Sequence, residues 1–560
     1  MEPRSEVANG GEDADTIALA SSNSSFRLEA TRMELPLLRF WLLSIGLLTG
    51  LLLSLLDTSI VATSLFTIGS EFNALTSVNW VALAYTLTYL GCAVLSARIS
   101  DIIGRRNAFI AFYIMFLIFS IACGFAQSLA QLIACRAVQG IGGSGLYSIA
   151  MIVLLEVAPE RLHKVVGGII AIVITIASIL GPVLGGTLTR YTTWRWIFWI
   201  NGPIGVVSVT IFFFTWPRSE YLPDIRRKSW KELDYFGSIL LIVASTMVVF
   251  PFQIAGELMD QWSKAIFIAP LAIGVVSWFA LIFWSILVDI CWGDMMDAAI
   301  PMRLLRDRVY VSVLLNTLFL GFPYMLVVYA FPLRLQIVNG KDALTGGIML
   351  LPMLGSSAVG TAITGALNSK QNRVFESLLV ATISVALGCG LMSTLSASFE
   401  VEPKALGFLV FIGFGWGIAV SIASMVATIH STHEDHAPAQ GMMAQVRVLG
   451  GSIGIAASSA ILGVFLQERV GSAQPRQVLP PQDDGASSTE GQYMAVRQAY
   501  SDAFNKDMQV CAIIGGIAVL LVTGTYSRKR LTLAERQTNS KIERRKAARS
   551  SQRLVDETSV

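Results

Sequence analysis

Apolar runs of roughly twenty residues alternate with short polar segments along nearly the whole chain. The runs begin near positions 40, 78, 108, 129, 167, 197, 235, 266, 310, 345, 377, 405, 441 and 508. A run of this length crosses a bilayer only as a helix, because an open strand leaves backbone groups unpaired in lipid. The pattern therefore predicts an all-α polytopic membrane protein with 14 transmembrane helices.

The composition agrees with this class of protein. Hydrophobic residues make up 54% of the chain and charged residues 14%, and the mean hydropathy is +0.63. A soluble protein of this composition lacks the polar residues needed to cover its surface. The six cysteines are scattered, mostly in apolar runs, and have neither metal-ligand spacing nor an obvious disulfide pattern. We expect the lipid bilayer as a partner, and no nucleic acid and no metal.

Lysine and arginine orient the chain in the membrane. An even number of spans places both termini on one side, and with the N-terminus inside, the cytoplasmic segments hold 29 of these residues and the outer loops 10. Cytoplasmic loops are the richer in basic residues, so both termini are expected in the cytoplasm. We expect the plasma membrane, with a vacuolar or vesicle membrane as the alternative.

The spans and polar segments predict five parts. Residues 1–38 form a disordered cytoplasmic tail that lacks the apolar core of a signal peptide. A six-helix bundle over 39–216 and another over 310–526 flank two linking helices, with their cytoplasmic loops, in 217–309. The second bundle is expected to contain one long extracytoplasmic loop, 467–506. Residues 527–560 form a basic cytoplasmic tail, expected to lie against anionic lipid.

Two charges lie inside apolar runs, where charge is costly and usually functional. Asp57 lies in the first span, and Arg136 lies in the fourth. Arg136, Gln139, Gly140 and Gly143 share one helical face that is expected to line a cavity. A carboxylate there can change its protonation as access alternates, and a nearby arginine can promote release of the proton. A fixed ion pair that clamps the helices is the alternative.

The turn after the second span combines opposite charges. Asp101 ends one predicted helix, Gly104 permits a tight turn, and Arg105 and Arg106 open the next helix. Asp101 can pair with a basic residue only when the inner helix ends are together, so the turn suits a gate. A charge cluster that merely orients the chain is the alternative.

The fifth span has a face of small residues and an internal proline. Ala177, Gly181 and Gly185 recur every four residues, which lets another helix approach closely. Pro182 removes a backbone donor and is expected to bend the helix. These features suit a moving interface, and tight static packing is the alternative.

Two further signals point to sites that we reject. Gly140, Gly142 and Gly145 match a dinucleotide-binding spacing, but the run lies in an apolar helix and follows no strand. A histidine-rich segment resembles a metal site by spacing alone, and a solvated loop explains it better. Its residues are His430, His433, Glu434, Asp435 and His436.

Spans nine to fourteen repeat spans one to six if spans seven and eight are an insertion. The turn at 365–373 then aligns with 97–105, and Leu409 occupies the register position of Arg136. Two six-helix bundles around a central pathway are typical of rocking-bundle transporters. The ionisable residues are concentrated in the first bundle.

Several motifs in order carry a resemblance to a known family. They are 56–61, 101–106, Arg136 with 139–140, 181–186 and the tryptophan-rich segment 194–203. The chain resembles the major facilitator superfamily, specifically its fourteen-span drug:proton antiporters, common as fungal toxin and multidrug efflux pumps. Ala97 and Ala177 replace the usual glycines, and Phe66 replaces a usual proline, which leaves the outer end of the first helix undetermined.

The resemblance implies roles for particular residues. It assigns proton coupling to Asp57 and Arg136, and it needs no cofactor because a proton gradient supplies the energy. The remaining assignments are an inner gate of Asp101, Arg105 and Arg106 and an antiport segment of Gly181, Pro182, Gly185 and Gly186.

These features predict a monomeric, proton-coupled exporter of a hydrophobic small molecule, such as a toxin, secondary metabolite or drug. The alternative is uptake of a nutrient or siderophore-like solute on the same fold. The Gly-Pro segment and the lack of an obvious charged substrate site in the second half argue against uptake. An enzyme or sensor is not supported, because we find neither a nucleophile–base pair nor a sizeable soluble domain. Candidate substrate-lining residues are Gln139, Tyr85, Tyr89, Tyr324, Met325 and Trp416.

Overall fold

The computed structural model describes residues 36–158, 162–217, 230, 233–257, 263–292, 296, 298, 300, 302–370, 373–431, 436–470 and 487–526. Within these residues 14 helical segments are long and apolar enough to cross a membrane. The predicted number of spans is thereby confirmed, and most of them begin within a few residues of the positions that the apolar runs indicate.

Six spanning segments form each half of the molecule, and two more link the halves. The first half contains α2 (Leu37–Ile60), η1 (Val61–Thr63), α3 (Leu65–Glu71), α4 (Trp80–Ile103), α5 (Arg105–Gly124), α6 (Leu129–Val157), α7 (His163–Tyr191), α8 (Trp196–Trp199) and α9 (Asn201–Thr215). The linking helices are α10 (Tyr235–Glu257) and α11 (Ala265–Cys291). The second half contains α12 (Met302–Leu305), α13 (Arg308–Ile337), α14 (Ala343–Met349), α15 (Leu351–Lys370), α16 (Val374–Met392), α17 (Lys404–Ile429), α18 (His436–Val470), α19 (Ser487–Val522) and η5 (Thr523–Thr525).

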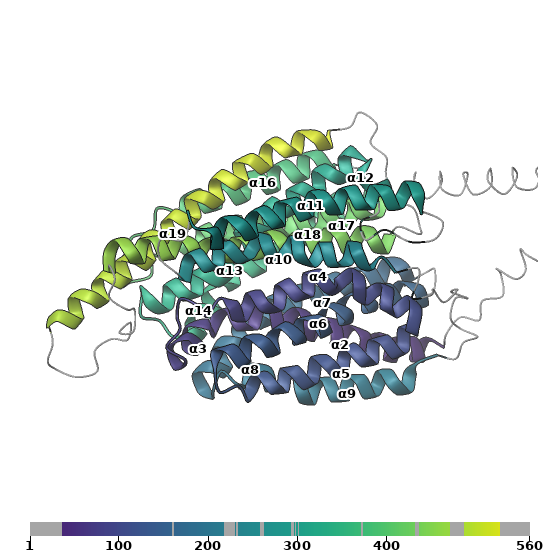
Figure 1. Ribbon diagram of the computed structural model, residues 1–560, viewed down its shortest axis with the longest axis horizontal. Coiled ribbons are helices and arrows are strands. Elements are labelled where there is room, and N and C mark those ends of the chain that lie inside the picture. Colours follow the sequence, from purple (N-terminus) through teal and green to yellow (C-terminus); the bar gives the residue numbers. More distant parts are fainter. Residues whose placement is uncertain are drawn as a thin grey trace, which may run out of the picture.

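The two halves lie side by side with their helices roughly parallel (Figure 1). In the first half α2 packs against α7 and α9, and α6 packs against α4 and α5. The second half repeats these relations: α13 packs against α18 and α19, and α17 packs against α15 and α16. The internal repeat expected from the sequence is therefore present in the packing.

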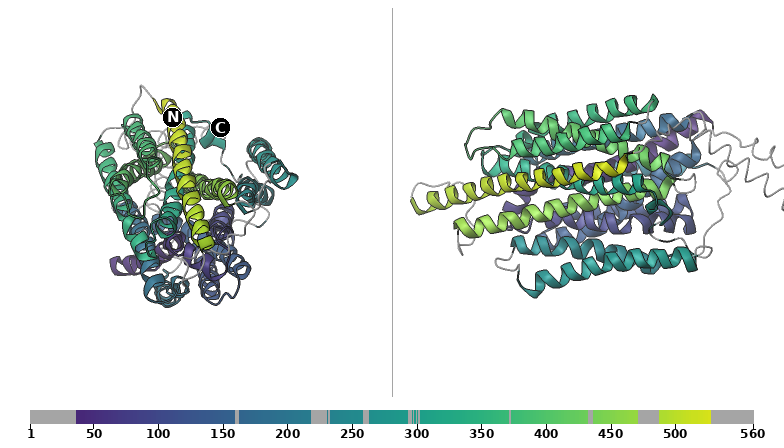
Figure 2. Two further views of the ribbon diagram at one scale, coloured as in Figure 1. Left: turned by 90° about the vertical axis from the view of Figure 1, so that its left-hand side faces the viewer. Right: turned by 90° about the horizontal axis from the view of Figure 1, so that it is seen from above.

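The linking helices lie at one edge of the molecule, as the end-on view in Figure 2 shows. α10 packs against α4 of the first half and α18 of the second half, and α11 packs against α10. α11 is the least buried of the spanning segments, which fits a helix whose outer face contacts lipid. The insertion between the bundles therefore covers one seam between the halves.

The start of α2 and the end of α19 lie at the same end of the bundle, which we call the tail end (Figure 1). We call the opposite end, where α3, α8 and α14 lie, the distal end. This arrangement follows from the even number of spans.

The glycine run of α6 lets this helix contact two neighbours closely. A Cβ at Gly140 would lie 2.5 Å from the carbonyl oxygen of Tyr85 in α4. A Cβ at Gly142 would lie 2.7 Å from the backbone nitrogen of Phe116 in α5. The spacing that resembles a dinucleotide motif is thus a helix-packing feature.

Polar contacts join the halves from the distal end to about mid-depth. Arg190 of α7 pairs with Asp342, the N-cap of α14, at 2.6 Å. Burial alone would raise the pKa of Asp342, but the Thr345 hydroxyl and Arg190 together lower it below its ordinary value. Further contacts include hydrogen bonds from Asn79 to Ser459 (2.5 Å), from Ser452 to Thr86 (3.1 Å) and from Gln445 to the Leu90 carbonyl (3.2 Å). The structure is thus a state in which the halves meet at the distal end.

The last span begins earlier than its apolar run. The predicted loop 467–506 is helical at both ends: α18 continues to Val470, and α19 begins at Ser487. Arg497 explains the difference, because this buried residue donates to the Val338 and Ala397 carbonyls while its guanidinium covers the Phe399 ring. A charged helix that packs against protein carries little hydropathy signal. Residues 471–486 of the predicted loop lie outside the described residues.

Phe66 lies where the family pattern has proline, at the distal end of the first span. Here α2 continues through one turn of 3-10 helix, and a separate short helix, α3, follows after Ser64. Phe66 packs against a small apolar cluster that includes Val338 and Val496. The chain therefore turns at this end without a proline.

Candidate functional site

A fully buried ion pair lies within the first half. Arg136 of α6 donates to the carboxylate of Asp57 in α2, and neither side chain is exposed. Two charges out of contact with water are tolerated in a membrane protein only when they are paired and hydrogen-bonded. The structure thus brings together the two intramembrane charges that the sequence singles out.

Further groups satisfy both charges. Asn201 of α9 donates to the other Asp57 oxygen at 3.2 Å. The Arg136 guanidinium donates to the Val81 carbonyl (3.1 Å) and to Gln139 (2.9 Å). It also lies over the Tyr85 ring, 4.2 Å from the ring centre, where a cation is attracted to the aromatic face. Four helices therefore converge on one charged cluster.

The stripe of Arg136, Gln139, Gly140 and Gly143 does share one face, but this face does not line an open cavity. Arg136 and Gln139 are both wholly buried, and a Cβ at Gly143 would collide with the Tyr85 hydroxyl. The expectation of a cavity-facing stripe is wrong for this conformation, because Tyr85 and Asp57 fill the space in front of it.

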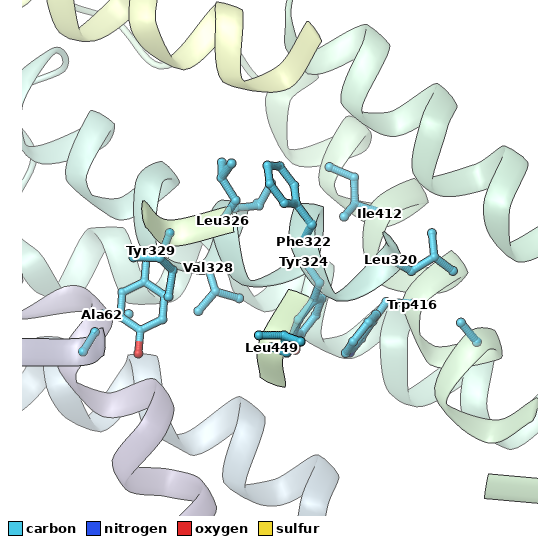
Figure 3. Close-up of a cluster of buried hydrophobic side chains, with 14 of the residues drawn as sticks. Ala62, Leu320, Phe322, Tyr324, Leu326, Val328, Tyr329, Ile412, Trp416 and Leu449 are labelled. Carbon is cyan, nitrogen blue, oxygen red and sulfur yellow. The ribbon is translucent and has the colours of Figure 1, made fainter. Parts of the chain in front are cut away.

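The charged cluster adjoins a contact between the halves. The Tyr329 hydroxyl of α13 donates to the backbone carbonyl of Thr58, the residue after Asp57. Figure 3 shows the Tyr329 hydroxyl pointing toward the first-half helix that carries Ala62. Gln336, two turns further along α13, donates to the Thr63 carbonyl at 3.2 Å. A change of charge at Asp57 would therefore occur beside a bond that holds the two halves together.

The Gly-Pro segment of α7 contacts both halves. Gly181 and Gly185 face α2, since a Cβ at either would collide with Ser59 or with the Ile60 carbonyl. Gly186 faces the other half, and a Cβ there would lie 2.5 Å from the Ala343 carbonyl oxygen of α14. The Pro182 carbonyl accepts from Thr63, and a Cβ at Gly347 of α14 would collide with it. α7 remains one helix through Pro182, so the segment is a packing surface between α2 and α14.

The turn between α4 and α5 forms an ion-pair cluster within the first half. Arg105 pairs with Asp101 and, at 3.0 Å, with Glu156 at the tail end of α6. Gly104 between them has φ +93°, a conformation that favours glycine. Burial raises the pKa of Glu156, and Asp101 adds to the effect while Arg105 opposes it. Arg106 lies apart from this cluster, 4.6 Å over the Phe213 ring of α9.

Replacing Arg105 by glutamine is expected to destabilise the protein more than the same change at Arg106. Loss of Arg105 leaves two carboxylates facing each other without a cation, which we expect to cost about 1–3 kcal/mol. Among the described residues Arg106 donates one hydrogen bond, to the Phe213 carbonyl, besides its ring contact, so its loss is expected to cost under about 1 kcal/mol. Thermal unfolding of the two purified variants compares them directly, and an equal or larger effect at Arg106 would contradict this reading of the turn.

The aromatic candidates form two groups, one in each half. Tyr85 stacks on Tyr89 with ring centres 5.9 Å apart in the first half. Tyr324 stacks on Trp416 at 4.2 Å in the second, as Figure 3 shows. Met325 lies next to this second pair in sequence but contacts α18 at Gly451. All four rings are at least nine-tenths buried.

Sequence reasoning missed several residues of the site. Asn201 and Tyr329 complete the surroundings of Asp57, and Glu156 completes the Arg105 cluster. Asp507 is a second carboxylate buried in a span, and it accepts a hydrogen bond from Ser458 at 2.5 Å. Asn201 and Asp507 are polar residues at the edges of apolar runs, which is the signal that was available for them.

The histidine-rich segment gives no support to a metal site. His430 forms a 2.6 Å hydrogen bond with Asp307, while His433 and its acidic neighbours lie outside the described residues. In the part of the chain that the structure describes, no group of three potential ligands gathers around a common point.

Comparison with known proteins identifies the family to which the chain is similar. The family model described as Major Facilitator Superfamily matches residues 47–455. The MFS-type transporter FPY5 of Fusarium mangiferae is 32% identical over 516 residues, which cover 89% of this chain and 86% of that protein. The MFS-type efflux pump MFS1 of Trichophyton rubrum is 27% identical over 532 residues, covering 91% of this chain and 96% of that protein.

A solved structure agrees at the level of the fold. The crystal structure of a bacterial homologue of the human lysosomal transporter Spinster, in an inward-facing and unoccupied conformation, has a TM-score of 0.57 and 16% identity. It covers 88% of this chain and 99% of that one. Together with the match over the paired charges and the Gly-Pro segment, these similarities show that the chain belongs to the Major Facilitator Superfamily of membrane transporters.

Proposed function

We propose that this transporter is a proton-coupled efflux pump that exports a hydrophobic small molecule, such as a toxin, secondary metabolite or drug, by alternating access. The observation that carries the proposal is the buried Asp57–Arg136 pair beside the Tyr329–Thr58 contact. A carboxylate that binds and releases a proton here changes the charge next to a contact that must break when the halves move apart.

Each residue has a part in the proposed cycle. In the deprotonated state Asp57 holds Arg136 through an ion pair, and Asn201 keeps the carboxylate in place. A proton on Asp57 removes the negative charge and weakens the pair, so that Arg136 relies on Gln139, the Val81 carbonyl and the Tyr85 ring. The Arg105 cluster lies within the first half, so in the proposed cycle it fixes the tail end of that half at the gate. The α7 segment acts as the sliding surface between the halves.

The direction of transport follows from the proposed orientation. With the basic tail end in the cytoplasm, the joined distal end faces the outside. This state is closed outward, so it suits loading of substrate from the cytoplasmic side. The Trichophyton rubrum relative, which is named an efflux pump, supports the same direction.

Family membership makes the protein a transporter and not an enzyme. We propose that it needs no cofactor besides the proton gradient, works as a monomer and resides in the plasma membrane. Its substrate enters from the cytoplasm or the inner leaflet of the bilayer.

Expression in a pump-deficient yeast host tests this proposal. We expect the protein to lower the cellular content of hydrophobic dyes and toxins such as Nile red, and we expect a protonophore to abolish the effect. Reduced accumulation that survives the protonophore would exclude proton coupling. Increased accumulation would favour uptake instead.

A further inference from the structure

The tryptophan-rich segment 194–203 contributes one polar side chain to the surroundings of the buried ion pair. Asn201, the first residue of α9, is wholly buried, and its amide nitrogen lies 3.2 Å from one carboxylate oxygen of Asp57. Arg136 donates to the other oxygen. Each oxygen of the carboxylate thus has its own donor, one neutral and one charged.

A chain of hydrogen bonds fixes the orientation of the Asn201 amide. The Ser120 hydroxyl of α5 donates to the Phe198 carbonyl at 2.9 Å, so its only hydrogen is engaged. The Ser120 oxygen therefore accepts from Asn201, at 2.9 Å. With one amide hydrogen directed at Ser120, the other is directed at Asp57. An amide turned the opposite way would place its oxygen against two other acceptors, so the network determines which way it points.

The rest of the segment holds this chain of bonds in place. The Trp194 indole donates to Glu71 of α3 at 2.5 Å, and Arg195 pairs with the same carboxylate at 2.8 Å. Phe198, whose carbonyl holds Ser120, is wholly buried and meets the Trp194 ring edge-on with ring centres 6.1 Å apart. The segment is therefore anchored to α3 at the distal end and reaches the ion pair from there.

Several helices place titratable groups around Asp57. In the described part of the chain these are Arg136 of α6, Tyr85 of α4, Tyr329 of α13 and Cys123 of α5. α7 meets α2 one turn further along, through Gly181 and the Ala177 carbonyl. An arginine keeps its charge at every physiological pH, and phenols and thiols ionise only in alkaline solution. Among these groups, Asp57 is therefore the one whose charge can change as a proton enters and leaves.

We propose that Asn201 is a positioning residue for proton coupling, which sets the pH at which Asp57 takes up and releases its proton. This inference rests on the proposed function and deepens it. A donor to the carboxylate stabilises the charged form relative to the acid, so Asn201 favours release of the proton. Ser120 keeps the amide from turning its oxygen toward the acid, which would have the opposite effect.

The bond acts on one step of the cycle. A proton from outside adds to the carboxylate of Asp57 and forms a neutral acid, while Arg136 keeps its charge. On the cytoplasmic side the acid gives the proton to water, and the carboxylate again accepts from Asn201 and Arg136. Without the amide donor this release becomes less favourable, so it limits the cycle when the cytoplasmic side is near neutral pH.

Infrared titration of the purified full-length protein tests the role. A protonated carboxylic acid has a carbonyl band, and the band of Asp57 is the one that Asp57→Asn removes. We expect its midpoint in N201L to lie about one to two pH units above that of the wild type, because a hydrogen bond to a charged group is lost. S120A should shift the midpoint by less in the same direction, and S120T, which keeps the hydroxyl, should leave it in place.

Asn316 offers a matched control. It is also a wholly buried asparagine, and it donates to the Ala518 carbonyl at 3.3 Å within the second half. N316L makes the same change of side chain and should leave the midpoint of Asp57 where it is. An equal shift in N316L would assign the effect to lost packing and overturn the proposal, as would a midpoint that neither N201L nor S120A moves. If N201L fails to fold, S120A and S120T still decide.

Export by reconstituted vesicles gives a second readout, which a merely structural role would not move. Export of the dye rhodamine 6G by N201L should be slow when the cytoplasmic side is neutral. It should recover as the pH of that side is raised by about one to two units, since release of the proton becomes favourable again. Slow export that no such change of pH restores would contradict the role of Asn201.

The titration also separates this role from the proposed coupling. If Asp57→Asn removes no carbonyl band from the wild-type titration, Asp57 takes up no proton and the coupling itself is refuted. A band of Asp57 whose midpoint is independent of Asn201 and Ser120 would refute only the role of Asn201.

Discussion

Replacing Asp57 by asparagine is expected to reduce proton-driven export to the level of membranes that lack the protein. The asparagine amide has the shape of the carboxylate but takes up no proton at physiological pH. The transporter therefore lacks the group that would bind the incoming proton. The change also leaves Arg136 buried without its counter-charge. Breaking a buried pair in this way costs about 3–5 kcal/mol, so the variant should melt at a lower temperature as well.

The loss of stability has to be separated from the loss of coupling. The double variant Asp57→Asn with Arg136→Gln removes both charges and should recover most of the stability, since no uncompensated ion remains. It should still be unable to export. Proton-driven export by either variant in reconstituted vesicles would refute the coupling role of Asp57.

Asp507 offers a matched control for this experiment. It is also a buried carboxylate within a span, but its hydrogen bond to Ser458 joins α18 and α19 within one half. Asp507→Asn is therefore expected to retain proton-driven export. A loss equal to that of Asp57→Asn would mean that burial of a carboxylate alone, and not its place beside the seam, decides coupling.

The architecture could be predicted because lipid imposes it. A run of about twenty apolar residues has to be a helix, and fourteen such runs with one weak repeat lead to two bundles and two extra helices. The Asp57–Arg136 pair could also be anticipated, since two opposite intramembrane charges lower each other's cost when they meet.

The contacts that join the halves could not be read from the sequence. Tyr329 reaches Thr58 across the seam, and nothing in either apolar run marks these residues as neighbours. Glu156, at the end of an apolar helix, resembles an ordinary charge that orients a span, although it pairs with Arg105.

The early start of α19 illustrates a different limit. The segment around Arg497 is polar enough to be interpreted as a loop, and its helix is stabilised by packing against α13 and the chain near Ala397. Local hydropathy measures affinity for lipid, whereas the Arg497 side chain is buried in protein.

Replacing each of two adjacent glycines of α7 by valine should have different effects. One variant should lose stability, and the other should lose transport. Gly185→Val places a side chain against the Ile60 carbonyl, inside the first half, where α2 and α7 must pack in every state. We expect it to lower stability by about 1–3 kcal/mol through overpacking. Gly186→Val places the same side chain against Ala343 and Leu344 of α14, across the seam. It should leave each half folded, with a melting temperature near that of the wild type, but keep the distal ends apart and stop transport.

A single cysteine at the distal seam distinguishes these outcomes. Ser459 is 4% exposed and accepts a hydrogen bond from Asn79 of the other half. In a background without the six native cysteines, a membrane-impermeant maleimide should label Ser459→Cys slowly in the wild type and faster with Gly186→Val. Both variants replace glycine by valine in the same helix. The difference in intrinsic helix propensity between the two residue types is therefore the same in both and does not affect the comparison. If Gly186→Val instead unfolds the protein as Gly185→Val does, or transports normally, then this part of α7 is static packing. If the two variants differ as predicted, Gly185 belongs to the permanent packing of the first half. Gly186 then belongs to a contact with α14 that forms and breaks in each transport cycle.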